Sequence, residues 1–190
     1  MESDTVLDLF RTSGALLEGH FRLTSGLHSD RYLQSALVLQ YPEHAEALGG
    51  ALAARVAHLQ PTAVLSPALG GIVIGHEVAR ALGIKALFAE RVDGRLTLRR
   101  GFALSAGDRV LVVEDVITTG GSTRETSQVA SAAGAAVVGA ASIIDRGSAP
   151  QRLDLPLYSL VNLQVPAYDP ESCPLCARDI PVVKPGSRAT

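Results

Sequence analysis

The chain has 190 residues, with 17 Lys and Arg against 19 Asp and Glu, and its 47% hydrophobic residues include only 4% aromatic ones. This length predicts one ordinary domain whose core is built from aliphatic side chains. The formal net charge of −2 argues against a general binder of nucleic acid or of a membrane surface, because such proteins usually carry a cationic excess.

The sequence also predicts where the protein works. No apolar run approaches the roughly 20 residues that span a bilayer. The start of the chain, Met1 to Asp4, lacks the basic and apolar regions of a signal peptide. The two cysteines share the segment Cys173-Pro-Leu-Cys176 and cannot form a long-range disulfide framework. We therefore expect a cytoplasmic protein that binds neither membrane nor nucleic acid.

The first predicted element is a short amphipathic helix over residues 5–17, where apolar residues recur at helical spacing. Two short extended pieces follow over residues 21–33, joined by the turn-like Thr24-Ser25-Gly26. Pro42 then opens a predicted helix that runs to about Leu59.

From residue 63 onward, short apolar runs alternate with glycine turns and helical spacing. The predicted strands are 63–65, 85–89, 109–113, 136–144 and 158–163, and the predicted helices are 72–82 and 122–133. This alternation predicts a parallel sheet flanked by helices, with a ligand crevice at the carboxyl ends of the strands. Residues 91–104, with the turn signal Asp93-Gly94, predict a mobile loop or a two-stranded arm.

The most informative segment covers residues 110–123 and reads Val-Leu-Val-Val-Glu-Asp-Val-Ile-Thr-Thr-Gly-Gly-Ser-Thr. Its turn of small residues precedes a predicted helix, where free N–H groups and hydroxyls form a nest that binds a phosphate without lysine. The carboxylates of Glu114 and Asp115 are placed to hold ribose hydroxyls or a divalent metal. The plainer interpretation, an ordinary helix cap at Ser122 with solvated acids, is weakened because both acids directly follow a buried strand.

Two common nucleotide motifs do not explain this segment. The glycines are adjacent rather than spaced as G-x-G-x-x-G, and the acids precede the turn instead of following it by about 20 residues. The Gly-Lys-Ser/Thr of a Walker loop is missing.

Residues 112–122 instead resemble the phosphoribosyl-pyrophosphate loop of type I phosphoribosyltransferases. The resemblance implies that Thr118 to Ser122 cradle the 5-phosphate, that both acids hold the ribose, and that pyrophosphate with Mg²⁺ meets the turn Pro67 to Gly71. The residues implied to bind phosphoribosyl pyrophosphate are Glu114, Asp115, Val116, Ile117, Thr118, Thr119, Gly120, Gly121, Ser122, Leu69, Gly70, Arg91 and Arg95.

A second resemblance concerns the base. Residues 19–32 resemble the Phe-x-Leu-x-Ser-Gly-x-x-Ser-x-x-Tyr segment of orotate phosphoribosyltransferases, which purine enzymes of the same fold do not share. The implied orotate contacts are Thr118, Arg146, Ser25 and Gly26, and a planar guanidinium suits the orotate carboxylate. Without the family context, Ser25-Gly26 reads as a simple turn and Arg146 as a surface charge at a strand end.

The sequence departs from this family at several cations. Lysine is common where Thr24 and Gly70 stand, and the mobile loop usually carries Lys-x-His-Gly, for which this chain has only residues 90–95. The resemblance implies that the loop closes over the neighbouring subunit's site in a homodimer. The available loop cations are Arg91, Arg95, Arg99 and Arg100, and their plainer interpretation is a solvated basic arm.

These resemblances imply a type I phosphoribosyltransferase fold, with a central parallel sheet flanked by helices and a small hood from both terminal segments. We expect a single domain over 1–190, divided into a hood and base-side segment (1–40), a core sheet (61–146) with mobile loop 91–104, and a tail (163–190). The implied reaction transfers the phosphoribosyl group to orotate in pyrimidine biosynthesis. The proposed catalytic residues are Asp115, Glu114 and Arg91, and Mg²⁺ is bound through the substrate, with Asp115 or Glu114 as further ligands.

Two rival functions remain open from the sequence. A purine or xanthine phosphoribosyltransferase would keep the phosphate turn but change the base-side segment. A regulator that only senses phosphoribosyl pyrophosphate would need a basic patch or an added DNA-binding module, which the charge and length disfavour.

The tail motif Cys173-Pro-Leu-Cys176 has the spacing of half a tetrahedral zinc site. Completion would need histidines or a second pair of cysteines from a partner subunit. The five histidines are scattered along the chain without ligand spacing, and His28, in the base-side segment, is the only one singled out as a candidate for a role. The sequence therefore favours two free thiols in a tail turn.

Overall fold

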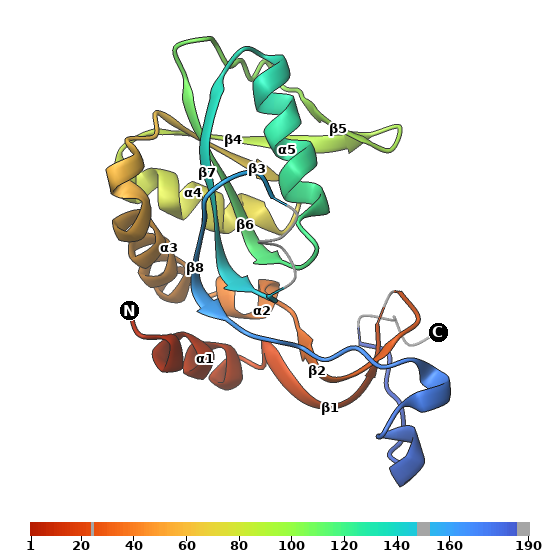
Figure 1. The fold of residues 1–190 in the computed structure, drawn as a ribbon. Coiled ribbons are helices and arrows are strands. Elements are labelled where there is room, and N and C mark those ends of the chain that lie inside the picture. The colour runs from red at the N-terminus through yellow and green to blue at the C-terminus, as the bar shows by residue number, and fades with distance from the viewer. Residues whose placement is uncertain (24, 148–152, 186–190) are drawn as a thin grey trace.

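A six-stranded sheet, with its strands in the order β5-β4-β3-β6-β7-β8, is the main feature of the molecule (Figure 1). The structure is a computed structural model that describes residues 1–23, 25–147 and 153–185. The strands of the sheet are β3 (Ala63–Pro67), β4 (Lys85–Val92), β5 (Arg95–Leu98), β6 (Arg109–Ile117), β7 (Ala136–Asp145) and β8 (Leu157–Asn162). Five strands run parallel, as predicted, whereas the edge strand β5 is antiparallel to β4. Of the two predictions for residues 91–104, the two-stranded arm is confirmed, because the turn at Asp93-Gly94 folds the chain back so that β5 pairs with β4.

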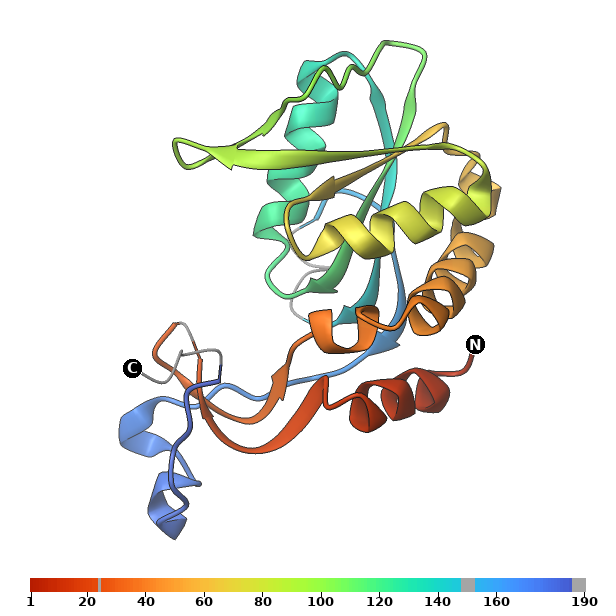
Figure 2. The same cartoon turned by 180° about the vertical axis from the view of Figure 1, so that it is seen from behind.

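Helices cover both faces of this sheet, with α3 and α4 on one face and α5 on the other (Figures 1 and 2). The helices are α1 (Ser3–Thr12), α2 (Ala36–Leu39), α3 (Pro42–Val56), α4 (Gly71–Leu82) and α5 (Gly121–Ala132), with short 3-10 helices η1 (Ala57–Leu59), η2 (Pro170–Ser172) and η3 (Cys176–Arg178). Successive residues of a strand point to opposite faces. Val64 therefore packs in the core beneath α3 and α4, while Ala63 and Leu65 pack in the core beneath α5.

The first predicted helix is wrong at its C-terminal end. Helix α1 stops at Thr12, and residues 16 and 17 already belong to strand β1. Gly14 has a φ of +71°, and the Ala15 amide donates a 2.7 Å hydrogen bond to the Phe10 carbonyl. The left-handed glycine turns the chain out of the helix axis, so the apolar pair that resembled a further helical turn starts a strand instead.

Strands β1 (Leu16–Arg22) and β2 (His28–Leu33) form a separate antiparallel hairpin beside the main sheet. The tail runs along this hairpin in both views (Figures 1 and 2). The Val183 amide donates to the His20 carbonyl at 2.8 Å, and Tyr168 and His28 exchange two backbone hydrogen bonds of 2.8 Å each. We call the β1–β2 hairpin together with residues 163–185 the hood.

Most other predicted boundaries agree with the structure to within a few residues. Two differences affect the site. The short helix α2 follows β2 and was not predicted, and strand β6 continues to Ile117, so that Glu114 and Asp115 lie within the strand. In the described part of the chain, no helix is both long and apolar enough to cross a membrane.

Candidate active site

Two neighbouring cavities open at the carboxyl ends of the parallel strands, where the sheet was expected to place its ligands. The larger cavity has a volume of about 770 Å³ and lies between the sheet and the hood. Its lining includes, on the side of the sheet, Asp115, Thr118, Thr119 and Arg146, and on the side of the hood, Ser25, Arg31, Tyr32, Val165 and Ala167. The smaller, of about 320 Å³, is lined by residues of α2, by Leu69 and Gly70, and by Val73. Gln34 and Asp115 line both, so the two cavities meet at these side chains.

The two acids of strand β6 have different surroundings, because neighbouring residues of a strand point to opposite faces. Asp115 lines both cavities. Glu114 is 9% exposed and accepts a hydrogen bond from the Thr123 hydroxyl in helix α5. Burial raises the pKa of Glu114 to about 7, against the opposing effect of the Thr123 hydrogen bond, and the charge of Asp115 raises it further. Of the pair, Asp115 is therefore the carboxylate that a ligand can reach.

The turn between Pro67 and Gly71 leaves space above Asp115. A Cβ atom at Gly70 would lie 2.9 Å from Asp115 Oδ1. A side chain at position 70 would therefore require the carboxylate to move, and glycine keeps the approach to Asp115 open from the smaller cavity. The peptide bond between Ala68 and Leu69 is cis, and the Leu69 side chain is 83% exposed.

The turn over residues 118–122 joins strand β6 to the N-terminus of α5. Gly120 has a φ of +74° and directly precedes the helix, which begins at Gly121. Thr118 and Thr119 line the larger cavity, so their side chains and the positive end of the helix dipole face the same space. The Ile117 side chain is instead fully buried against Leu153, which leaves only its backbone for contact with a ligand.

Arg146 follows strand β7 directly and lies beside the end of strand β6. Its amide donates to the Ile117 carbonyl at 2.9 Å, and its Nη2 donates to the Val165 carbonyl at 3.3 Å. Burial lowers the pKa of the half-buried guanidinium. The preceding residue, Asp145, accepts hydrogen bonds from the Gly147 amide and from Asn162. The arginine is thereby held at the junction between the sheet and the hood.

The hood supplies the remaining wall. Ser25 lines the larger cavity, and Gly26 has a φ of +87° in the turn beside it. Thr24, where the family commonly has lysine, lies outside the described residues. Gln34 and Ser35 were missed by the sequence reasoning, although both line the larger cavity. The Ser35 hydroxyl is buried without a hydrogen-bond partner among the described residues, and its place directly before α2 was a signal for a helix start that the sequence reasoning did not use.

The arginines of the β4–β5 arm do not line either cavity. Arg91 Nη2 lies 2.9 Å from Glu125 Oε2 on helix α5, and Glu125 also accepts from the Leu96 amide at 2.7 Å. Arg100 binds Glu90 through two hydrogen bonds of 2.8 Å. Within one chain, Arg91 is therefore engaged with helix α5 and Arg100 with Glu90 of the arm, which projects from the edge of the sheet (Figure 2).

The carboxylates at this edge fit a cation that is bound mainly by a substrate. Mg²⁺ is usually held by one or two carboxylates together with phosphate oxygens and water. Asp115 offers one accessible carboxylate between the two cavities, whereas Glu114 is buried and bound to Thr123. Asp115 fits a magnesium–pyrophosphate substrate, and Glu114 does not in this arrangement.

The two lysines lie outside the cavities. Lys85 begins strand β4, at the opposite end of the sheet, and its Nζ lies 2.8 Å from Asp108 Oδ1. This ion pair lowers the pKa of Asp108 to about 2, with help from hydrogen bonds of Ser105. Lys184 lies in the tail, and neither lysine lines a cavity described above. Arginine, hydroxyls and backbone N–H groups therefore supply the donors of the site.

The chain is similar to known proteins over most of its length. Residues 37–171 match the family model described as a phosphoribosyl transferase domain. A curated orotate phosphoribosyltransferase of Pelotomaculum thermopropionicum is 52% identical over 188 residues, which cover 99% of each chain. One from Chlorobium phaeobacteroides is 50% identical over 189 residues, covering 100% of this chain and 98% of the relative.

A solved structure has the same fold. The crystal structure of Mycobacterium tuberculosis orotate phosphoribosyltransferase in complex with inorganic phosphate aligns with a TM-score of 0.71 at 24% identity, covering 85% of this chain and 95% of that one. The family match covers most of the chain, and the curated relatives are similar along its whole length. The chain therefore belongs to the phosphoribosyltransferase family, among the orotate phosphoribosyltransferases.

Proposed function

We propose that this protein transfers the 5-phosphoribosyl group of phosphoribosyl pyrophosphate to orotate, giving orotidine 5′-phosphate and pyrophosphate in the biosynthesis of UMP. The observation that carries the proposal is the larger cavity. This cavity is lined by the turn of small residues at the N-terminus of α5, by the carboxylate of Asp115, which can accept hydrogen bonds from ribose hydroxyls, and by the guanidinium of Arg146. The curated relatives with about half of their residues identical have names that specify orotate.

The turn 118–122 binds the 5-phosphate through its backbone N–H groups and hydroxyls. Asp115 accepts hydrogen bonds from the ribose hydroxyls and lies beside the anomeric carbon, where positive charge develops. The smaller cavity, with Leu69 and Gly70, receives the pyrophosphate group. We assign the pyrophosphate to the smaller cavity because Asp115 lines both cavities, so a ribose bound at Asp115 adjoins the smaller one.

Arg146 binds the carboxylate of orotate, while Ser25, Gly26 and Thr118 complete the pocket for the base. A ring nitrogen of the orotate anion forms the new bond to the anomeric carbon as the bond to the pyrophosphate oxygen breaks. The negative charge of orotate lies on its carboxylate, so the ring N–H that becomes the nucleophile loses its proton in the same step, to an oxygen of the departing pyrophosphate or to water. The chain acts mainly by orienting two anions against each other.

Glu114 is a positioning residue in this account. Its bond to Thr123 links strand β6 to the first turn of helix α5, and so fixes the turn that receives the phosphate. When bound, Mg²⁺ neutralises the charge of the leaving pyrophosphate. Asp115 and the substrate oxygens would hold it.

The arm arginines act in a homodimer. Arg91 and Arg95, with Arg99 and Arg100, lie on an arm that lines neither cavity of its own chain, which supports closure of the arm over the neighbouring subunit's site. There, the cations would shield pyrophosphate from water and stabilise its charge. We place the enzyme in the cytoplasm, where its two thiols stay reduced.

The test is a substrate panel. The purified chain is incubated with phosphoribosyl pyrophosphate and Mg²⁺, and with orotate, adenine, hypoxanthine or xanthine in turn. We expect consumption of orotate alone, with release of pyrophosphate. Turnover of a purine without turnover of orotate would overturn the choice of base. Absence of any turnover, together with a salt-dependent shift of nucleic acid, would indicate a regulator instead.

A further inference from the structure

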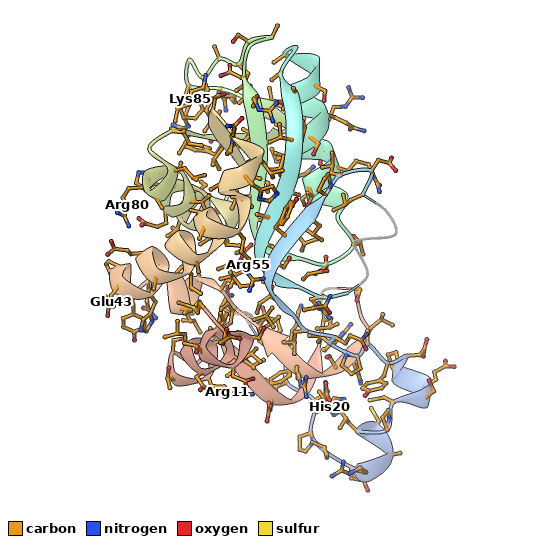
Figure 3. The ribbon with its side chains drawn as sticks, turned by 60° about the vertical axis from the view of Figure 1, so that its left-hand side comes forward. Arg11, His20, Glu43, Arg55, Arg80 and Lys85 are labelled. Atoms are coloured by element: carbon orange, nitrogen blue, oxygen red, sulfur yellow. The ribbon has the colours of Figure 1, made fainter. Side chains whose placement is uncertain are left out.

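Four metal-ligating side chains meet in the hood, away from both cavities described above. They are His20 of β1, His28 of β2, and Cys173 and Cys176 of the tail, and their ligand atoms all lie within 4.8 Å of one another. The histidines and the cysteines are up to 156 residues apart in the chain, so the spacing of residues along the sequence did not reveal the group. Figure 3 shows His20 beside the sulfur atoms of the tail. We propose that these four residues form a structural zinc site that fastens the tail to the β1–β2 hairpin.

The contact distances between the histidine nitrogens and the cysteine sulfurs are close to those of a tetrahedral zinc site. With Zn–N bonds of about 2.05 Å and Zn–S bonds of about 2.3 Å, tetrahedral angles place N and S about 3.6 Å apart and two nitrogens about 3.3 Å apart. Cys173 Sγ lies 3.6 Å and Cys176 Sγ 3.8 Å from His20 Nε2. Cys176 Sγ lies 3.3 Å from His28 Nδ1, and the two ring nitrogens lie 2.9 Å apart.

The orientation of one ligand is set by a second contact. His20 Nδ1 lies 2.7 Å from the Ile180 carbonyl oxygen, which only accepts hydrogen bonds, so Nδ1 carries the proton. The lone pair of Nε2 then points into the group of four. Metal-bound histidines usually donate their other N–H to a carbonyl or carboxylate in this way.

The burial and charge of the group also suit zinc. His20 and Cys173 are each 3% exposed and His28 is 8% exposed, while Cys176 lies at the solvent-facing side. Two thiolates and two neutral imidazoles around Zn²⁺ give no net charge, so little free energy is lost on burial. Binding releases two thiol protons. Four protein ligands leave no open position for chemistry, which makes the site structural.

The tail part of the hood buries few apolar side chains, so a metal link would add to its stability. Among the described tail residues 163–185, only Cys173 and Leu175 are buried hydrophobic side chains, and Val182 and Val183 are 47% and 54% exposed. The tail therefore has almost no apolar core of its own. Small units of this kind are commonly stabilised by a metal or by disulfides. The two cysteines are free.

The site also bears on the larger cavity. Ser25 on the hairpin and Val165 and Ala167 on the tail line that cavity, and the zinc would hold these two segments together. Removal of zinc should therefore raise the KM for orotate more than that for phosphoribosyl pyrophosphate. This consequence rests on the proposed function, whereas the metal content of the protein does not.

The experiment measures metal in the full chain, purified under reducing conditions without a metal-affinity step. We expect about one zinc ion per chain after dialysis. Replacement by Co²⁺ should give the intense visible absorption of a tetrahedral thiolate site. His20→Ala and Cys176→Ser should each retain less than about half of the zinc, whereas the control His76→Ala, whose side chain is 66% exposed on α4, should retain all of it.

The wild-type measurement decides the matter even if a ligand variant fails to fold. A chain that carries no zinc after purification and binds neither Zn²⁺ nor Co²⁺ when the metal is added would overturn the proposal. A disulfide between Cys173 and Cys176 in the reduced preparation would do the same. Loss of zinc from His76→Ala to the same extent as from His20→Ala would also contradict the assigned ligands. The substrate panel is a separate measurement, so failure of one proposal leaves the other standing.

Discussion

The core sheet and the hood form opposite walls of the same cavity, but they are held together by different forces. In the core, fully buried aliphatic residues such as Leu52 and Ile143 pack between the sheet and its helices. In the hood, backbone hydrogen bonds between the hairpin and the tail surround a group of two histidines and two cysteines. In the proposed reaction, the well-packed core holds the phosphoribosyl group, while the wall that faces the base depends on a few polar contacts.

The largest expected effect is on the folding stability of the core, and it distinguishes the core from the hood. Leu52→Ala removes a fully buried side chain of helix α3 and should lower the free energy of unfolding by about 2–5 kcal/mol, because a cavity remains. Urea denaturation measures this loss. The zinc content of the folded variant should stay unchanged, and a loss of zinc in parallel with stability would show that the hood and the core are one cooperative unit.

Asp115→Asn should affect chemistry rather than folding. It keeps the size of the side chain but removes the charge that we propose lies beside the anomeric carbon, so we expect kcat to fall by about 10²- to 10³-fold. Steady-state formation of orotidine 5′-phosphate measures the effect, and Asp4→Asn at the exposed start of α1 is the control. Wild-type rates in Asp115→Asn would mean that this carboxylate is structural.

Because the pKa of Glu114 is raised in the folded chain, we expect the free energy of unfolding to depend on pH. Its pKa rises from 4.5 to about 7 in the folded chain. Between these values the folded chain holds a proton that the unfolded chain has lost, so the free energy of unfolding falls as pH rises. The loss amounts to about 3 kcal/mol in all, at about 1.4 kcal/mol per pH unit.

Glu114→Gln should abolish this contribution. Urea denaturation at pH 5 and pH 8 should show a smaller difference for the variant than for the wild type. The exposed Glu18→Gln is the matched control and should keep the wild-type pH dependence. If Glu114→Gln retains the full wild-type dependence, the buried carboxyl is not the titrating group.

The smallest of these effects concerns the base. Arg146→Ala removes a charged hydrogen-bond donor at the junction of sheet and hood, and should weaken orotate binding by about 1.5–3 kcal/mol, or about 10- to 150-fold in KM. The KM for phosphoribosyl pyrophosphate should change much less. An equal effect on both substrates would remove Arg146 from the base pocket, and Arg11→Ala on the exposed side of α1 serves as the control.

The core was largely predictable from the sequence because its signals are local. Buried strands and glycine turns follow one another within short stretches, and residues such as Gly83, with a φ of +68° at the end of α4, mark boundaries directly. The end of α1 was mispredicted because an apolar pair after Gly14 fits both a helix and a strand. The accessible acid could not be separated from the buried one, since that depends on how Thr123 packs against Glu114.

The hood was predictable only in outline. Its hairpin showed a turn signal, but the tail lacks periodic apolar residues, and its partners lie at the other end of the chain. His20 and Cys173 contact each other across 153 residues. Only the tertiary structure could bring such residues together, and the same holds for Gln34 and Ser35 in the cavity wall.

The measurement that tests the account most directly is a crystal structure with orotate and phosphoribosyl pyrophosphate, or an unreactive analogue of it, bound together. The account predicts orotate between Arg146 and the Ser25-Gly26 turn, the 5-phosphate in the turn 118–122, and the ribose hydroxyls on Asp115. Orotate bound away from Arg146 and the hood, or a 5-phosphate outside this turn, would contradict it.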